Sequence, residues 1–160
     1  MVIIVMDVSG SGKSTIGRLL AQDLGWKFYD ADDFHSPHNI AKMSRGLALT
    51  EDDRFPWLQS LRALILNILE SGKQAVIACS ALRETYRTSL AVTDKVQFIY
   101  LKGSFEQIKD RLTNRQNHFM TGDLLAHQFA TLEEPHDVLA VDISLPPEKI
   151  VKEIRVGLEF

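Results

Sequence analysis

The chain opens with a strand pattern, a glycine-rich turn and a helical pattern in direct succession, and this order constrains its fold more than any other feature. Residues 2–6 are apolar without interruption and mostly β-branched, which is typical of a strand buried on both faces of a parallel sheet. Residues 14–24 repeat apolar side chains at helical spacing, and Gly25 is a suitable stop. The sequence therefore predicts a strand–loop–helix unit at the start.

Alternating strand and helix patterns continue along the rest of the chain. An acidic loop at 30–33 is expected first, followed by a polar segment at 36–53 that contains a short helix. Pro56 then suits the first turn of a long helix. The further strands are expected at 27–29, 74–79, 96–101 and 139–143, and the further helices at 56–71, 84–91, 105–114, 122–132 and 146–158. Right-handed crossovers then give a three-layer α/β fold, a parallel sheet of about five strands with helices on both faces. We expect a single domain over residues 1–160.

Composition excludes several classes of protein. Of the 160 residues, 45% are apolar and 24% charged, which fits an ordinary folded domain. Eighteen Lys and Arg against 21 Asp and Glu give a net charge of −3, so we expect no broad contact with nucleic acid or an anionic membrane. The longest apolar run is too short to span a membrane, and the single cysteine fits a reducing compartment. We expect a cytoplasmic protein.

The turn after the first strand matches a phosphate-binding loop, G-x-x-x-x-G-K-[ST], at all but its first position. Glycines let backbone N–H groups converge on phosphate oxygens, and the helix N-terminus adds partial positive charge. Lys13 is expected to reach the β- and γ-phosphates of ATP, and the Ser14 hydroxyl to bind Mg²⁺. The predicted nucleotide-binding residues are Val8, Ser9, Gly10, Ser11, Gly12, Lys13, Ser14 and Thr15.

Asp7 stands where the pattern requires its first glycine. A carboxylate there repels phosphate if it faces the loop and has little effect if it points away, and the sequence alone does not decide between these. It is also compatible with an inactivating change. We predict that Asp7 weakens ATP binding.

Acidic residues follow the second predicted strand, where Asp30 and Asp32 form an Asp-x-Asp pair. Ligands of an open parallel sheet bind at the carboxyl ends of its strands, so both carboxylates should face the phosphate loop. One of them can assist Mg²⁺ while the other contacts an acceptor hydroxyl, since phosphoryl transfer relies on positioning and charge stabilisation. Taken alone, an Asp-x-Asp pair is equally compatible with a solvated acidic loop.

Arginines near the same sheet edge suit a carboxylate or phosphate ligand. Arg54 lies just before the start of the predicted long helix, and Arg83 follows the third predicted strand together with Ser80. Arg87, one turn later, fits a surface ion pair better than a ligand site. Arg111 and Arg115 lie four residues apart on one helical face, which fits a lid over the phosphates at about 105–120 or, alternatively, a solvated basic face.

Several blocks of sequence together resemble the thermoresistant gluconokinase family over nearly the whole chain. They are Asp30-Ala31-Asp32-Asp33-Phe34-His35, Asn39-x-x-Lys42-Met43, Asp53-Arg54-x-Pro56-Trp57-Leu58, Cys79-Ser80-Ala81-Leu82 with Tyr86-Arg87, His118-Phe119-Met120, and Gln128-Phe129-Ala130-Thr131-Leu132-Glu133. The resemblance implies a P-loop kinase with a fold like that of shikimate kinase and the nucleoside monophosphate kinases. It also implies ATP-dependent phosphorylation of D-gluconate to 6-phospho-D-gluconate, a mobile lid and a homodimer.

By this resemblance, Asp32 is the base toward the 6-hydroxyl and Asp30 assists the metal held by Ser14. The resemblance makes Lys13, Asp32, Arg111 and Arg115 the catalytic candidates, and Asp32, His35, Arg54, Ser80 and Arg83 the gluconate-binding candidates. Asp7, Ala48 and His127 depart from the family pattern. Two alternatives stay open: a kinase for another small hydroxy acid such as shikimate, and a nucleotide-binding protein weakened by Asp7.

Overall fold

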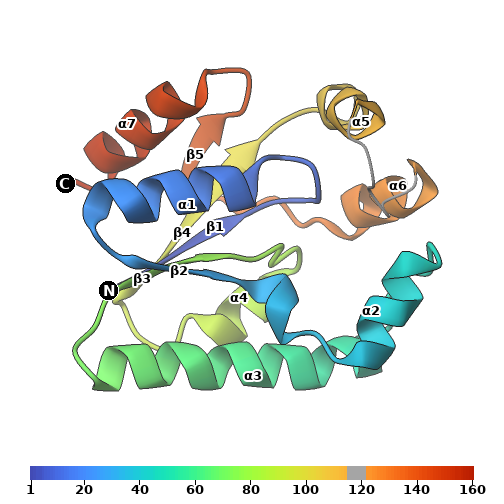
Figure 1. Ribbon diagram of the computed structural model, residues 1–160, viewed down its shortest axis with the longest axis horizontal. Coiled ribbons are helices and arrows are strands. Elements are labelled where there is room, and N and C mark those ends of the chain that lie inside the picture. The colour runs from blue at the N-terminus through green and yellow to red at the C-terminus, as the bar shows by residue number, and fades with distance from the viewer. Residues whose placement is uncertain (115–121) are drawn as a thin grey trace.

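A five-stranded parallel sheet forms the centre of the protein in the computed structural model, which describes residues 1–114 and 122–160 (Figure 1). Its strands are β1 (Val2–Met6), β2 (Lys27–Asp30), β3 (Ala75–Ala78), β4 (Val96–Lys102) and β5 (Leu139–Asp142). Their order across the sheet is β2-β3-β1-β4-β5, and every neighbouring pair is parallel. The predicted α/β fold is confirmed.

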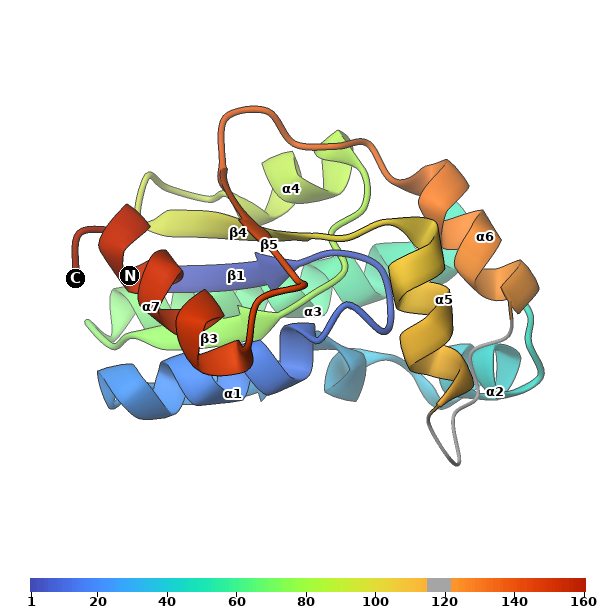
Figure 2. The ribbon, with the colours of Figure 1, turned by 90° about the horizontal axis from the view of Figure 1, so that it is seen from above.

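Helices cover both faces of this sheet (Figure 1). Helices α1 (Lys13–Leu24) and α7 (Pro147–Gly157) lie side by side on one face, and α3 (Glu51–Glu70) and α4 (Glu84–Leu90) lie on the other. The three remaining helices, α2 (Pro37–Ser44), α5 (Phe105–Thr113) and α6 (Gly122–Thr131), gather at one end of the molecule, as Figure 2 shows from above. None of the helices in the described ranges is long and apolar enough to cross a membrane.

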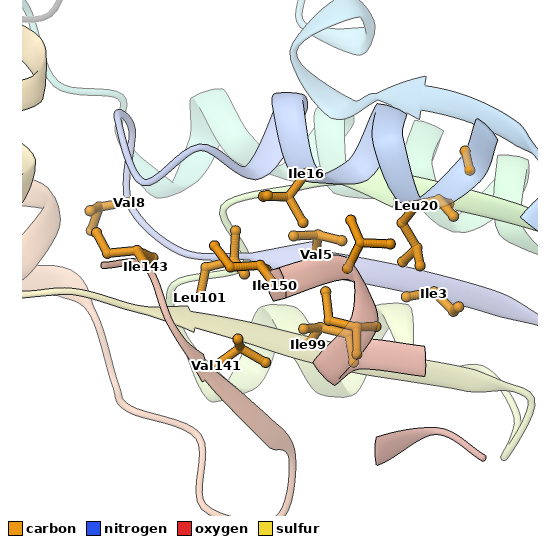
Figure 3. Close-up of a cluster of buried hydrophobic side chains, with 14 of the residues drawn as sticks. Ile3, Val5, Val8, Ile16, Leu20, Ile99, Leu101, Val141, Ile143 and Ile150 are labelled. Atoms are coloured by element: carbon orange, nitrogen blue, oxygen red, sulfur yellow. The ribbon is translucent and has the colours of Figure 1, made fainter. Parts of the chain in front are cut away.

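The alternation of side chains along β1 divides the interior into two apolar cores. Ile3 and Val5 point toward α1 and α7, where they pack with residues such as Ile16 and Leu20 (Figure 3). Val2, Ile4 and Met6 point to the opposite face, against the apolar stripe of α3. Because all five residues are fully buried, β1 has no solvent-facing side, as its unbroken apolar sequence predicts.

The long helix α3 begins five residues earlier than predicted. Thr50 caps it, since its hydroxyl accepts a hydrogen bond from the Asp53 amide while the Asp53 carboxylate accepts one from the Thr50 amide. This reciprocal capping box outweighs the preference of Pro56 for a first turn, so Pro56 lies inside the helix on its exposed side. Arg54 is therefore a residue of the first helical turn rather than of a preceding loop.

The acidic segment after β2 is also more ordered than the predicted loop. Residues Ala31–Phe34 form a short 3₁₀ helix, capped by the Asp30 carboxylate, which accepts a hydrogen bond from the Asp32 amide. Elsewhere, the helices and strands predicted with bounds begin and end within one residue of the observed ones. The capped turn holds Asp30 and Asp32 in a fixed relation at the end of β2.

Candidate active site

A cleft at the carboxyl ends of the strands brings together residues from distant parts of the chain. Lys13, Asp32, His35, Arg54 and Ser80, all predicted as site residues, line it. Ser9, predicted as part of the nucleotide-binding loop, lines it as well. The remaining lining residues are Met43, Leu47, Ala48, Leu49, Trp57, Leu82, Leu124, His127 and Gln128. The position agrees with the rule that open parallel sheets bind ligands beyond the carboxyl ends of their strands.

The loop between β1 and α1 has the backbone geometry of an anion site. Gly10 and Gly12 have φ angles of 83° and 96°, which favour glycine. A Cβ atom on Gly10 would lie 2.8 Å from the Leu112 side chain of α5, so no larger residue fits without a shift. The N-terminus of α1 has no side-chain cap, and Lys13 forms no ion pair with the described residues. The helix end and the ammonium group are therefore available to phosphate.

Asp30 joins this loop to the other side of the cleft, which we call the acceptor side. The acceptor side consists of residues 31–35, helix α2, the first turn of α3 and residues 80–83. Its Oδ2 atom accepts a 2.8 Å hydrogen bond from the Ser14 hydroxyl, while Oδ1 accepts the Asp32 amide at 3.0 Å. A hydroxyl and a carboxylate oxygen are ligands that Mg²⁺ takes together with phosphate oxygens. No group of three or more His, Cys, Asp or Glu side chains in the described residues could hold a metal by itself. The pair formed by Ser14 and Asp30 thus fits a metal that arrives with a nucleotide.

Asp7 is buried, with 1% of its surface exposed, and neither carboxylate oxygen has a hydrogen-bond partner among the described residues. Burial raises its pKa to about 7, an effect that the Val8 amide and Lys13 offset only in part and to which Glu134 adds. Burial also raises the pKa of Tyr100, and the nearby carboxyls of Asp7 and Glu134 raise it further. The carboxyl group at the start of the phosphate loop therefore changes its charge near neutral pH.

The acceptor side is built around an ion pair. Lys42 of α2 lies 2.6 Å from Asp53 of α3, which also takes part in the helix cap with Thr50. The Lys42 hydrogen bond is the main reason that the pKa of Asp53 lies far below its usual range, and the Thr50 amide adds to the effect. These contacts fix α2 against the first turn of α3.

The arginines occupy three different environments. Arg54 lines the cleft, donates a 3.2 Å hydrogen bond to the Tyr86 hydroxyl and lies 3.6 Å from Glu51. Arg83 pairs with the same carboxylate, at 3.5 Å, and does not line the cleft. Arg87 is buried and donates to the backbone carbonyls of Ala81, Leu82 and Glu133, so the expectation of a surface ion pair for it is wrong.

Arg111, in the last turn of α5, contacts the phosphate loop from the other side. Its guanidinium donates to the backbone carbonyl of Ser11 at 3.2 Å and to that of Ile143, which follows β5. It thereby connects α5, the phosphate loop and the end of the last strand. Arg115 and the block at 118–120 lie outside the described residues.

Two contributions to the site were not foreseen from the sequence. Gln128 of α6 accepts a 2.8 Å hydrogen bond from the Ser9 amide and donates to the Ser9 hydroxyl at 3.3 Å. These partners are 119 positions apart, so no local pattern reveals the contact. Asn39 is 2% exposed and contacts both His35 and the Asp53 carbonyl. Asn39 belongs to one of the blocks that carry the family resemblance, but the sequence assigns it no role in the site.

Comparisons with known proteins agree with this geometry. The family model for shikimate kinase matches residues 9–154. A probable gluconokinase of Mus musculus is 45% identical over 168 residues, covering 91% of each chain, and the thermoresistant gluconokinase of Escherichia coli K12 is 43% identical over 155 residues, covering 94% of this chain and 89% of its own. The crystal structure of a gluconokinase from Sinorhizobium meliloti 1021 superposes with a TM-score of 0.88 at 41% identity, covering 98% of this chain and 90% of the other.

The parallel sheet, the glycine loop opening onto a helix N-terminus and the match to shikimate kinase define a P-loop kinase that uses ATP. Identities above 40% over nearly the full length narrow this class further. The chain belongs to the gluconokinase family.

Proposed function

We propose that the protein transfers the γ-phosphoryl group of ATP to the 6-hydroxyl of D-gluconate, giving 6-phospho-D-gluconate and ADP. The observation that carries the proposal is one cleft lined by Lys13, Asp32, His35 and Arg54 together, in a chain 43% identical to a named gluconokinase. A cation for the phosphates and a carboxylate for the hydroxyl are what phosphoryl transfer requires.

Asp32 is the proposed base. Its side chain is 65% exposed at the cleft, so a substrate hydroxyl can reach it, and its backbone is held by the Asp30 carboxylate. In the reaction the hydroxyl oxygen attacks the γ-phosphorus, the bond from that phosphorus to the β,γ-bridging oxygen breaks, and Asp32 accepts the hydroxyl proton. Lys13 stabilises the charge that develops on the phosphate oxygens.

Ser14 and Asp30 are the proposed metal ligands, since their side-chain oxygens already lie together. When bound, Mg²⁺ would neutralise charge on the β- and γ-phosphates. Val8 to Thr15 are proposed as the nucleotide-binding loop, in which the buried Ser11 hydroxyl has no hydrogen-bond partner among the described residues.

Gluconate is a carboxylate, and Arg54 is the proposed partner for that group, together with Ser80, which also lines the cleft. Arg83, proposed with them from the family resemblance, pairs with Glu51 outside the cleft lining and would have to leave that partner to reach gluconate. Arg111 and Arg115 are proposed to act on the phosphates, and residues 105–120 to close over them. We also propose a cytoplasmic homodimer. The one cysteine, Cys79, is free and buried, which is consistent with a reducing compartment.

The test is a coupled assay of ADP release with gluconate, shikimate, other sugar acids or no acceptor. We expect acceleration by gluconate well above every other acceptor. Faster turnover with shikimate than with gluconate would favour a shikimate kinase activity. Tight ATP binding without acceleration by any acceptor would instead favour a nucleotide-binding protein, which the buried, unpartnered Asp7 gives reason to consider.

A further inference from the structure

The imidazole ring of His35 is held in one orientation by the residues around it. It stacks on the Trp57 indole with ring centroids 4.4 Å apart and an interplanar angle of 11°, and its side chain is 4% exposed. The indole is itself anchored, because its Nε1 donates a 2.7 Å hydrogen bond to the Ala31 carbonyl. The stacking therefore fixes the plane of the ring, and the 3.2 Å contact of Nδ1 with Asn39 distinguishes its two edges.

Asn39 determines which ring nitrogen carries the proton. Its Nδ2 atom lies 2.8 Å from the backbone carbonyl of Asp53 and 3.2 Å from Nδ1 of His35. A carbonyl only accepts hydrogen bonds, so the amide group must present its NH₂ on that side. The second hydrogen of the same NH₂ then points to Nδ1, which must be an unprotonated acceptor. The proton of a neutral ring is consequently on Nε2.

The surroundings of His35 also favour the neutral ring. Burial lowers its pKa, and Arg54 lowers it further, while Asp32 and Asp30 act in the opposite direction. His35 and Asp32 both line the cleft, and Nε2 of His35 lies 3.8 Å from Oδ1 of Asp32. That separation is too long for a hydrogen bond. Nε2 and the carboxylate are therefore close together but not bonded to each other.

We propose that Asn39 is a positioning residue, which holds His35 as a neutral imidazole whose Nε2–H donates to the reacting hydroxyl beside Asp32. This rests on the proposed function. One hydroxyl oxygen accepts from Nε2–H and donates its own hydrogen to Asp32, which fixes two of its directions and leaves a lone pair for phosphorus. An imidazolium would instead pair with the Asp32 carboxylate and lower its basicity. The neutral tautomer keeps the base free.

Nitrogen NMR of uniformly ¹⁵N-labelled, unliganded protein tests the tautomer directly, with the His35→Gln variant identifying the His35 signals. We expect a protonated Nε2 and an unprotonated Nδ1 at pH 7 to 8. A proton on Nδ1, or a charged ring at pH 7, would overturn the proposal. This measurement needs no substrate, so its outcome is independent of whether gluconate is the acceptor.

The Asn39→Asp variant tests the consequence for catalysis, because a carboxylate accepts from Nδ1 and moves the proton there. We expect kcat with gluconate to fall by about tenfold to a hundredfold, with the KM for ATP unchanged and the Nδ1–H tautomer in the spectrum. Asn67→Asp, an amide-to-acid change at an exposed position of α3, is the matched control and should leave both readouts unaltered.

A merely structural Asn39 would give a different pattern. Asn39→Asp would then lower thermal stability and kcat together while the His35 tautomer stayed the same, and that outcome would overturn the positioning role. Should Asn39→Asp fail to fold, the spectrum of the parent protein still decides the tautomer on which the proposal depends.

Discussion

The phosphate loop and the acceptor side meet in one cleft, but they treat their polar groups in opposite ways. On the loop, the Asp7 carboxylate and the Ser11 hydroxyl are buried without a hydrogen-bond partner among the described residues. On the acceptor side, Asp53 is paired with Lys42, and Asn39 with two acceptors. The acceptor side is thus organised before any ligand binds, whereas the loop keeps these two buried polar groups unsatisfied, and one of them, Asp7, opposes phosphate while it is charged.

This difference indicates how each side of the cleft contributes to the free energy of ligand binding. A satisfied network is rigid and costs little further ordering when substrate arrives. An unpartnered buried carboxylate destabilises the fold while it is charged, because burial disfavours the ionised form. The acceptor side should therefore be sensitive to changes of geometry, and the loop to changes of charge and pH.

The largest expected effect is on the acceptor side. Asp32→Asn removes the proposed base but keeps the shape of the side chain, so kcat should fall by at least about a hundredfold with ATP affinity nearly unchanged. Asp33→Asn, the same change at the exposed neighbouring position of the 3₁₀ helix, is the control. Steady-state kinetics and nucleotide titration check this. A kcat for Asp32→Asn within about threefold of the parent would exclude the base role.

The next largest effect is on the loop and depends on pH. The pKa of Asp7 is about 7 in the folded protein, well above the ordinary value of 3.8 for an Asp side chain in water, so the folded state binds the proton more tightly. Stability from this group is complete below pH 4 and is lost as pH rises toward 7. Between pH 5 and pH 8 the parent should lose roughly 2 to 3 kcal/mol relative to Asp7→Gly. Urea denaturation of both proteins at the two pH values measures this.

The affinity for ATP should depend on pH through the same ionisation of Asp7. If phosphate binds only when Asp7 is uncharged, the dissociation constant rises up to about tenfold between pH 6 and pH 8. Asp7→Gly should bind ATP more tightly and lose this part of the pH dependence, while the titration of ATP itself affects both proteins equally. Equal affinities and parallel pH profiles for the two would show that the buried carboxylate does not act on the nucleotide.

The layered fold could be predicted because its signals are local. The unbroken apolar run of β1 and the helical spacing in α1 each lie within about a dozen residues, and the glycine loop between them has a fixed pattern. Pro56 misled the prediction for α3, since a cap at Thr50 determines the start of that helix. In a sequence, a capping box with Asp instead of Glu or Gln three residues after the cap is a weaker indication of a helix start than a proline.

The site was predictable only where chemistry dictates the residue. Lys13 and Asp32 are recognisable because phosphate needs a cation and a hydroxyl needs a base. Contacts between distant segments, such as Ser9 with Gln128, arise only when the chain is folded. The burial of Asp7 belongs to the same class, since a single sequence does not give the direction of a side chain at the end of a strand.

Removing a helix cap should have a smaller effect, and the two regions should differ in whether the KM for gluconate changes with it. Thr50→Ala and Ser104→Ala each remove a capping hydroxyl, from α3 and α5 respectively, and each should cost about 1 kcal/mol of stability. Only Thr50→Ala should also raise the KM for gluconate, because the cap places the Asp53 carbonyl that holds Asn39. Chemical denaturation and kinetics measure both. An equal change of KM in the two variants would contradict the proposed organisation of the acceptor side.

The smallest expected effect concerns backbone strain, which the two regions also treat differently. The phosphate loop places glycine at its positive φ angles, but on the acceptor side Ala81 has φ 44° and is fully buried. A left-handed conformation costs a non-glycine residue about 1 to 2 kcal/mol. A change to glycine removes this strain but lowers the stability by roughly 0.5 to 1 kcal/mol, because the unfolded chain gains conformational freedom. Ala81→Gly also removes a fully buried methyl group, worth about 0.8 kcal/mol, so the effects nearly cancel and the stability should change by less than about 0.5 kcal/mol. Gly12→Ala, at φ 96° with no steric conflict, has no such offset and should destabilise the protein by about 1 kcal/mol in the same denaturation experiment. A loss of stability from Ala81→Gly as large as that from Gly12→Ala would contradict this.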